Sequence, residues 1–344
     1  MNFASDNTVG AHPAVLRALS ACNAGAVGSY GADPVTARAE AALRELLGVP
    51  EAAVRFVATG TAANALVCAQ LAPSWGRIYC HDSAHILRDE CGAPEFFSHG
   101  AKLVPIAGEA GRITPQALAA AIRAGDTGSL NDGRNALVSI TNATEWGTVY
   151  SPADVAALAA VARDAGLGLH MDGARFANAV AHLDCAPADL LAGVDALCFG
   201  GTKNGALAAE AVVFPDPARA EGFDYRRKQA GQVWSKQRFL AAQMLALVEN
   251  GLWLDLARHA NALAARLGQG IVQAGGRLLA PVEANEVFAL LPAEAHERAR
   301  AHGAVYYLWQ DQPPLPGQPV AVRLVTNWAM AEDQVGHLLD LLRG

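Results

Sequence analysis

The sequence predicts an α/β protein with a large domain built on a mostly parallel central sheet and a small α+β domain at the C-terminus. Three observations carry this prediction. Short apolar runs alternate with helical stretches from about residue 50 to residue 215, as in βαβ units. A long helical stretch between residues 235 and 274 then leads into a different pattern of strands. With 344 residues, the chain is long enough for two domains, which we place at 1–240, N-terminal segment included, and 241–344.

The predicted strands of the large domain are short apolar runs bounded by turn residues. Helical patterns near residues 61–72, 115–124 and 153–165 separate several of them. Strands separated by such helices pair in parallel, because a parallel crossover needs a dozen or more residues. Parallel sheets of this kind bind ligands at the carboxyl ends of their strands. The seven runs lie at residues 54–59, 77–81, 102–106, 136–141, 167–171, 196–199 and 211–214.

The small domain is predicted from the pattern that follows residue 235. Two helical stretches come first, at residues 235–249 and 252–274. Strand-like runs and a final helix then follow, at 277–291, 304–309 and 320–326 for the strands and 331–343 for the helix. The segment 125–135, rich in Gly, Asp and Asn, is predicted to be a loop inside the large domain.

Composition and charge argue against several classes of protein. Hydrophobic residues make up 52% and charged residues 17%, which is typical of a globular chain. A net charge of −7 argues against a general nucleic-acid or anionic-membrane surface. The six cysteines form no CxxC pair, so we expect neither a metal site nor a disulfide framework. We see no secretory leader and no uncharged apolar run of roughly 18 residues, and therefore expect a cytoplasmic protein.

Two polar residues stand at predicted strand ends, where a ligand is expected. Asp172 follows the run 167–171 in the segment HMDGAR. Lys203, one of only four lysines in the chain, follows the run 196–199 in the glycine-rich segment GGTKNG. Taken singly, the aspartate could cap the next helix and the lysine could be solvated on a surface turn. The lysine segment is not a phosphate-binding P-loop, because the GxxxxGK spacing is absent.

Together, this aspartate and lysine predict a pyridoxal 5′-phosphate (PLP) site. The amine of Lys203 would form a Schiff base with the cofactor. The carboxylate of Asp172 would pair with the pyridinium nitrogen and keep it protonated. A third segment, TGTAAN at residues 59–64, turns from a strand through glycine into a helix. The N–H groups and the positive dipole end at that helix start would hold the phosphate.

The order of these three segments resembles the low-specificity L-threonine aldolase family of fold-type I PLP enzymes. The similarity extends over nearly the whole chain. The opening SDNT at residues 5–8 resembles the SDT-like start of the family, and YGADP at residues 30–34 is similar to its YGxDP turn. His85 matches a family histidine, and Arg323 lies in a segment that matches the arginine strand near the C-terminus.

The resemblance implies a role for each matching residue. Gly60, Thr61 and Asn64 would contact the cofactor, the first two at its phosphate, and His85 would stack on the ring. Arg175 would lie near the ring hydroxyl. The substrate carboxylate would be held by Ser5, Arg175 and Arg323, with Tyr30 near the substrate or a neighbouring subunit's site. A planar guanidinium suits this task, because it grips a carboxylate with two parallel hydrogen bonds.

One departure from the family pattern concerns the acid–base group. Residues 142–147 read NATEWG where many members have ENTHNG, so Glu145 replaces a histidine close to the β-hydroxyl of the substrate. A glutamate in reach could still take the hydroxyl proton. It could also bind a structural partner and leave that task to His85 or to a water.

The predicted function is cleavage of L-β-hydroxy-α-amino acids, such as threonine, allo-threonine or phenylserine, to glycine and an aldehyde. The alternatives are β-elimination or racemisation of an amino acid, or a PLP-fold binding protein that has lost catalysis. The expected partner is a small amino acid, with no nucleic acid and no membrane. The family forms dimers and tetramers, so the resemblance also implies a homodimer or homotetramer with shared active sites.

Overall fold

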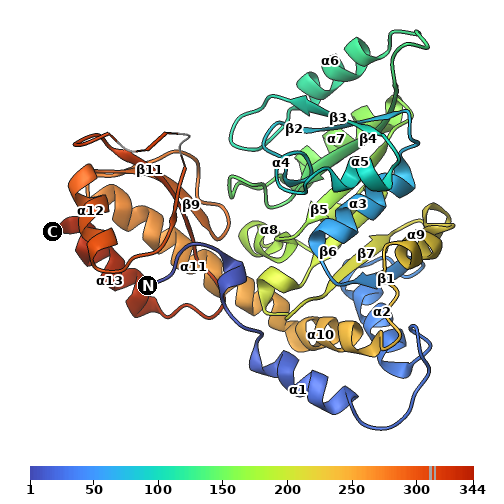
Figure 1. Cartoon of the computed structure of the whole chain (residues 1–344), viewed down its shortest axis with the longest axis horizontal. Coiled ribbons are helices and arrows are strands. Elements are labelled where there is room, and N and C mark those ends of the chain that lie inside the picture. Colours follow the sequence, from blue (N-terminus) through green and yellow to red (C-terminus); the bar gives the residue numbers. More distant parts are fainter. Residues whose placement is uncertain (310–311, 314) are drawn as a thin grey trace.

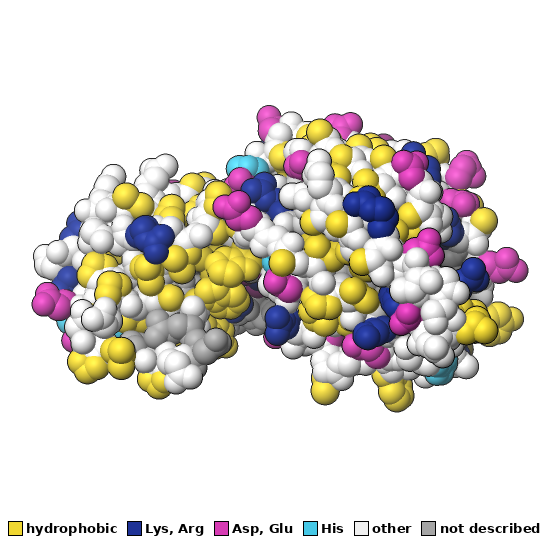
Figure 2. All heavy atoms as spheres, turned by 90° about the horizontal axis from the view of Figure 1, so that it is seen from above, with side chains coloured by type: hydrophobic (Ala, Val, Ile, Leu, Met, Phe, Trp, Pro, Cys, Tyr) yellow, Lys and Arg dark blue, Asp and Glu magenta, His cyan; other side chains and the backbone are white. Residues whose placement is uncertain are grey.

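The computed structural model describes residues 1–309, 312–313 and 315–344, and these residues form two lobes around two separate sheets (Figure 1). The larger lobe contains a seven-stranded sheet and the smaller lobe a four-stranded sheet. Seen from above in Figure 2, the molecule narrows between the lobes, and side chains of both charges are interspersed over the larger one.

The seven-stranded sheet confirms the predicted fold class. Strand β7 runs antiparallel to both of its neighbours, and every other pair is parallel. All residues of β5, β6 and β7 are buried, as expected where helices cover both faces of a sheet. In spatial order the strands are β1 (Ala53–Val57), β7 (Glu210–Phe214), β6 (Ala196–Gly200), β5 (Gly168–Gly173), β4 (Arg134–Thr141), β2 (Gly76–His81) and β3 (Lys102–Ile106).

Helices pack against both faces of this sheet. Leu66 and Val67 of α3 share a core with Phe223 of α9 on one face, whereas Leu43 of α2 and Leu158 of α7 belong to the larger core on the other. Three of the helices were predicted, namely α3 (Gly60–Leu71), α6 (Pro115–Gly125) and α7 (Pro152–Asp164). Further helices of this lobe were not predicted, namely α1 (Pro13–Cys22), α2 (Pro34–Leu47), α4 (His85–Arg88), α5 (Ala93–Phe97), α8 (Phe176–Leu183) and α9 (Phe223–Gln229).

The smaller lobe has an antiparallel sheet in the order β10-β11-β9-β8. The predicted run 277–291 is divided into two strands, with Pro281 in the irregular segment between them. Proline cannot donate to a strand ladder, which explains why the run does not continue. The elements are β8 (Arg277–Leu278), β9 (Glu286–Leu291), α12 (Ala293–Ala301), β10 (Tyr307–Leu308), β11 (Val320–Val325) and α13 (Glu332–Arg343).

Two segments connect the lobes. Helix α11 (Leu252–Gln273) buries Trp253 in the core of the larger lobe and Leu267 in that of the smaller one. At the N-terminus, Phe3 is fully buried in the smaller core, and its carbonyl accepts a hydrogen bond from the backbone of Val325 at 2.8 Å. The first residues thus pack with the smaller lobe, although the sequence grouped them with the large domain. The boundary at residue 240 stays a prediction.

One stretch, Arg238–Gln273, has the length and apolar composition of a membrane-crossing helix, judged on the described residues. It consists of α10 (Arg238–Val248), a short 3₁₀ turn and α11, and a left-handed residue, Asn250, interrupts it. Helix α10 packs on α1 and α2, and α11 packs on α8. The apolar side chains of the stretch Arg238–Gln273 therefore pack in the protein core, where Leu240 and Met244 are fully buried.

Candidate active site

A cavity of about 380 Å³ opens at the carboxyl ends of β4, β5 and β6. Predicted residues from several distant segments meet in its wall, namely Gly60, Thr61, Asn64, His85, Glu145, Asp172, Arg175 and Lys203. The described wall does not include three other predicted residues, Ser5, Tyr30 and Arg323. The parallel sheet accounts for the convergence, because strand ends that are far apart in sequence lie at one edge.

Asp172 lies near the end of β5 and is almost completely buried. Its Oδ2 accepts a hydrogen bond from the amide nitrogen of Asn64 at 2.8 Å, and its Oδ1 accepts one from the backbone N–H of Ala174 at 2.9 Å. The second bond is a local turn contact and not a helix cap, because α8 has Arg175 as its N-cap and no side-chain capping bond. The first bond joins the Asp172 carboxylate to Asn64 on α3, and both residues line the cavity.

Lys203 lies in a 3₁₀ turn, Thr202–Asn204, directly after β6. The turn ends at Gly205, whose φ of 100° favours glycine. A side chain at the preceding Gly200 would stand 2.5 Å from the carbonyl oxygen of Ala174. The glycines of this segment thus allow β6 to pass close to the chain that follows Asp172, which brings Lys203 and Asp172 to the same cavity.

Helix α3 begins at Gly60, with Thr59 as its N-cap. The Thr59 hydroxyl accepts a hydrogen bond from the Ala62 backbone at 3.2 Å. A Cβ built on Gly60 would meet nothing within 4 Å, so the helix start faces open space in the cavity. Backbone N–H groups at such a helix start attract an anion.

His85 begins the short helix α4, and its ring is partly exposed in the cavity wall. Its Nδ1 lies 2.9 Å from Oε1 of Glu90, a carboxylate with no solvent-exposed surface. The hydrogen bond with Glu90 raises the pKa of His85, against burial, which lowers it. The ring is therefore held in one orientation by a neighbour that the sequence analysis did not identify.

Glu145 lies at the same edge of the sheet as Asp172 and Lys203. Its Oε1 accepts two hydrogen bonds of 2.7 Å, from the Thr141 hydroxyl and from the His85 backbone N–H. Its Oε2 is buried without a hydrogen-bond partner among the described residues. Burial raises the pKa of Glu145 to about 7, although both hydrogen bonds act in the opposite direction.

A second carboxylate with similar properties lines the cavity near Lys203. Glu210, the first residue of β7, accepts a hydrogen bond from the backbone N–H of Gly201 at 3.1 Å. Burial raises the pKa of Glu210 to about 7, against the opposing effects of hydrogen bonds from Thr202 and Gly201 and the charge of Lys203.

Arg175 is surrounded by acidic groups of the protein itself. Its Nε and one terminal nitrogen donate to the two carboxylate oxygens of Asp6, at 2.8 and 3.2 Å. Its other terminal nitrogen lies 3.1 Å from Oε2 of Glu286. Burial favours the neutral form of Asp6, but Arg175, Lys203 and Asn285 outweigh it and leave the Asp6 pKa lowered. The guanidinium that was predicted to hold a substrate carboxylate thus already binds two carboxylates.

The other predicted carboxylate-binding residues lie outside the wall of the cavity. Ser5 caps the 3₁₀ helix Asp6–Thr8, where its hydroxyl accepts a hydrogen bond from Asn7 at 3.1 Å. Arg323, on β11, donates to the Ala4 carbonyl at 3.3 Å, and its Nε is buried without a hydrogen-bond partner among the described residues. Its guanidinium also lies over the rings of Tyr307 and Trp309.

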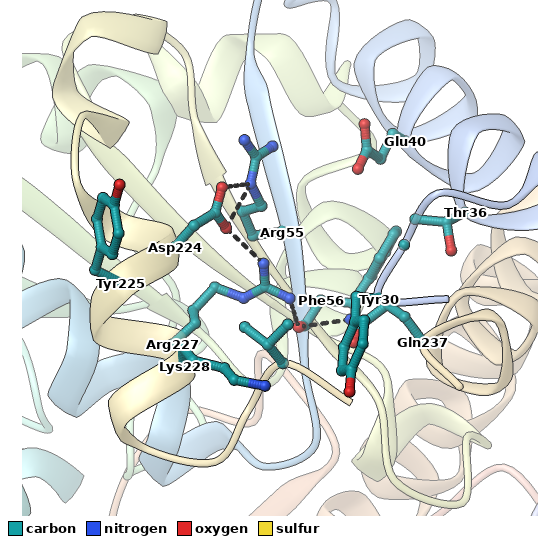
Figure 3. Close-up of a pocket in the computed structure, with 12 residues that line it drawn as sticks. Tyr30, Thr36, Glu40, Arg55, Phe56, Asp224, Tyr225, Arg227, Lys228 and Gln237 are labelled. Carbon is teal, nitrogen blue, oxygen red and sulfur yellow. Dashed lines mark hydrogen bonds and ion pairs between the residues drawn. The ribbon is translucent and has the colours of Figure 1, made fainter. Parts of the chain in front are cut away.

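Tyr30 lies in a different cavity, of about 550 Å³, on the larger lobe (Figure 3). Tyr30 is 55% exposed, and the ammonium nitrogen of Lys228 lies 4.7 Å from the centre of its ring. The cavity is also bordered by an ion-pair cluster in which Asp224 contacts Arg55 and Arg227. Tyr30 therefore does not line the cavity that contains Lys203 of the same chain.

Comparison with known proteins identifies the family. A family model described as beta-eliminating lyase matches residues 2–294. The chain belongs to this family. Two low-specificity L-threonine aldolases are each 45% identical to it: one from Pseudomonas aeruginosa, over 89% of this chain and 88% of the relative, and one from a Pseudomonas species, over 99% and 96%. The structure of a Leishmania major threonine aldolase has a TM-score of 0.93 and 29% identity, covering 99% of this chain and 98% of that one.

The predictions of family, fold class, lyase activity and PLP cofactor are confirmed by these comparisons. The cavity of this beta-eliminating lyase family member also fits PLP on its own geometry. A lysine amine, a buried aspartate and the open start of α3 face one space, as the aldehyde, ring nitrogen and phosphate of the cofactor require. The individual roles of the site residues stay predictions.

Four acidic residues in or next to the site have no role among the sequence predictions, namely Asp6, Glu90, Glu210 and Glu286. Asp6 lies inside the segment SDNT, which resembles the family's opening, so the sequence does contain a signal for a role of this residue. Glu90 follows a four-residue helix, and Glu286 opens a strand of the smaller lobe. Neither position has a local pattern that distinguishes it from a solvated glutamate.

Proposed function

We propose that this protein is a PLP-dependent aldolase that cleaves L-β-hydroxy-α-amino acids of the threonine, allo-threonine or phenylserine type into glycine and an aldehyde. The observation that carries the proposal is the cavity in which Lys203, Asp172 and Glu145 converge. The 45% identity to two L-threonine aldolases over most of the chain supports the same reaction.

The cofactor supplies an electron sink for the bond pair released when the Cα–Cβ bond breaks. Lys203 provides the amine that attaches the cofactor to the protein. Asp172, anchored by Asn64, keeps a proton on the ring nitrogen. His85, at the cavity wall, lies where it can cover the ring.

Glu145 takes the proton of the substrate β-hydroxyl. Its Oε1 is fixed by Thr141 and by the His85 backbone, which leaves Oε2 to accept a hydrogen bond. A pKa of about 7 is suited to a general base near neutral pH, because the group is then both partly ionised and sufficiently basic. Its hydrogen bond to the hydroxyl would distinguish β-hydroxy amino acids from other amino acids.

Ser5, Arg175 and Arg323 hold the substrate carboxylate, and of these three only Arg175 is in the described wall of the Lys203 cavity. The buried Nε of Arg323 has no hydrogen-bond partner among the described residues, and a planar guanidinium can bind a carboxylate through two parallel hydrogen bonds. The nitrogens of Arg175, in contrast, contact Asp6 and Glu286, so this residue contributes mainly by orienting the site.

The active unit is a homodimer or homotetramer with shared active sites. Support comes from Tyr30, which lies exposed beside a cavity of about 550 Å³ and outside the Lys203 cavity of its own chain. Light scattering of the purified protein measures the oligomer, and a monomer that turns over substrate at full rate would contradict this assignment. A cytoplasmic location is supported by the six cysteines, all of which are free.

The test of the proposed function is an assay across a panel of amino acids. The holoenzyme should be yellow, should bleach with borohydride, and should release glycine and the matching aldehyde from β-hydroxy amino acids. Release of ammonia and a keto acid would indicate β-elimination, and loss of optical rotation without cleavage would indicate racemisation. A yellow protein inactive on every substrate would point to a binding protein.

A further inference from the structure

Glu90 connects the two groups that flank the cofactor region of the cavity. It follows α4 in the chain, and its side chain has no exposed surface. Its Oε1 lies 2.9 Å from Nδ1 of His85 and accepts a hydrogen bond of 2.9 Å from the amide nitrogen of Asn64. The same Asn64 nitrogen donates to Asp172. Four side chains thus form one hydrogen-bonded chain in the order His85, Glu90, Asn64, Asp172.

The direction of the hydrogen bonds sets the tautomer of His85. An ionised carboxylate oxygen can only accept, so Nδ1 of His85 carries the hydrogen in the bond to Glu90. The Nε2 atom is then the ring nitrogen that is available to a bound molecule. The charged groups that act on this ring are Glu90 and Asp172, which favour its protonated form, and Lys203, which opposes it.

The amide of Asn64 is constrained in the same way. It uses its two hydrogens for two carboxylates, one on Glu90 and one on Asp172. If Glu90 were absent, the amide would lose the contact that keeps its nitrogen turned toward Asp172, since an amide can rotate to present its oxygen instead.

Building on the proposed function, we infer that Glu90 is a positioning residue that orients His85 and Asn64 together. His85 then presents Nε2 toward a bound molecule while Glu145 remains the base for the β-hydroxyl, and Asn64 holds Asp172 against the ring nitrogen. Carboxylates that orient a histidine in this manner contribute to catalysis without touching the substrate. Burial raises the pKa of Glu90 above its usual range, and the hydrogen bonds with His85 and Asn64 limit that rise.

The first test compares Glu90→Gln with Asp89→Asn in the holoenzyme. Both variants remove one acidic charge at neighbouring positions, but Asp89 is exposed and outside the cavity. Glu90→Gln should lower kcat for the best β-hydroxy amino acid by about 10-fold to 100-fold, a part of what acid–base catalysis contributes. Asp89→Asn should change kcat by less than about two-fold. Equal kcat values in the two variants would overturn the inference.

A double-mutant cycle separates positioning from general stability. If Glu90 acts through His85, Glu90→Gln should cost much less in a His85→Asn background than in the wild type. An equal cost in both backgrounds would show that Glu90 does not act through His85, and would overturn the inference.

The second test needs no turnover, so it can fail independently of the proposed aldolase activity. The ring proton of His85 is followed by NMR as a function of pH and assigned from its loss in His85→Asn. In Glu90→Gln the pKa of His85 should fall, because the nearest negative charge is gone. In Glu90→Asp, which keeps the charge, it should fall less. An unchanged His85 titration in Glu90→Gln, or equal shifts in both variants, would overturn the inference.

Discussion

Two kinds of buried acid differ in what holds them: two glutamates that line the Lys203 cavity, and an aspartate that contacts Arg175 in its wall. Glu145 and Glu210 are held by hydroxyl and backbone N–H groups, all of them neutral donors. Asp6 is held by the guanidinium of Arg175 through two hydrogen bonds and by Asn285 through a third. Burial raises the pKa of Glu145 to about 7, whereas the pKa of Asp6 is lowered against the same effect.

The comparison shows that burial alone does not decide whether an acid of this cavity can exchange a proton. Glu286 provides an intermediate case. It lies 3.1 Å from Arg175 but gains no hydrogen bond at its Oε2, and burial still raises its pKa. The charge of Asp6 adds to the effect of burial on Glu286, whereas Asp6 itself, whose pKa is lowered, accepts directed hydrogen bonds from a charged donor. Neutral donors position a carboxylate and leave it able to take up a proton.

The largest loss of activity is expected when Lys203 is replaced. The charge of Lys203 favours the ionised forms of Asp6 and Glu210. Lys203→Ala should lower turnover by roughly 10⁴-fold or more, the scale seen when a covalent catalyst is removed. Borohydride reduction and peptide mapping of the wild type should place the cofactor label on Lys203. A label on Lys102, Lys228 or Lys236 would contradict the assignment.

Asp172 should have the next largest effect. Asp172→Asn removes the charge that stabilises the protonated ring and should lower kcat by roughly 10³-fold. Part of the cofactor should remain bound, because Lys203 and the start of α3 are unchanged. Cofactor content is measured by absorbance and kcat by glycine release. Turnover close to that of the wild type would show that Asp172 acts only as a turn cap.

Glu145 tests whether a buried carboxylate held only by neutral donors can act as a general base. Glu145→Gln should slow cleavage of β-hydroxy amino acids by roughly 10²-fold, as expected for loss of a general base. Exchange of the glycine α-proton needs no β-hydroxyl and should stay close to the wild-type rate. In the wild type, kcat/KM should rise with pH through about 7 as Glu145 ionises, and the variant should lack this rise. Equal losses of cleavage and exchange would count against the assignment.

The smallest effect concerns the pH dependence of stability without cofactor. The pKa of Glu210 is about 7 in the folded chain and 4.5 as a reference, so the folded state binds the extra proton between these values. Stability should therefore fall as pH rises through this window, by about 3 kcal/mol for this group. Urea unfolding should show that Glu210→Gln lacks this decrease.

Asp6 should show the opposite sign. Its folded pKa is lowered from 3.8, so its stabilising contribution is present above that value and is lost as pH falls through the folded pKa. The gap in stability between the wild type and Asp6→Asn should thus narrow in acid. A constant gap across the acid range would indicate that the hydrogen bonds of Arg175 do not depend on the charge of Asp6.

The sequence predicted the parts of the fold that depend on local pattern. All seven strands of the large sheet were found because each is a short apolar run between turn residues. Helices α1 and α2 were missed, although a proline at the first helical position marks both, after His12 in one case and Asp33 in the other. Both helices precede residue 50, so they lie outside the alternation of apolar runs and helical stretches from which α3, α6 and α7 were predicted.

The rest of the site depends on contacts that no local pattern encodes. Arg175 and Asp6 are 169 residues apart, and Glu286 reaches Arg175 from the other lobe. Strand-end position was enough to locate Lys203 and Asp172, since the geometry of a parallel sheet brings such ends together. It could not indicate that Arg175 already binds two protein carboxylates, or that Tyr30 lies in a separate cavity.

The N-terminal segment packs in the smaller lobe, against residues that are synthesised last. Phe3 leaves the ribosome first, yet the core that buries it extends to Leu342. At about 5–20 residues per second, this segment waits roughly 20–70 s for its partners. Asn7, a few residues further on, lines the cavity of Lys203. Every strand of the large sheet, the last of which ends at Phe214, is therefore synthesised before the residues that complete the core around Phe3.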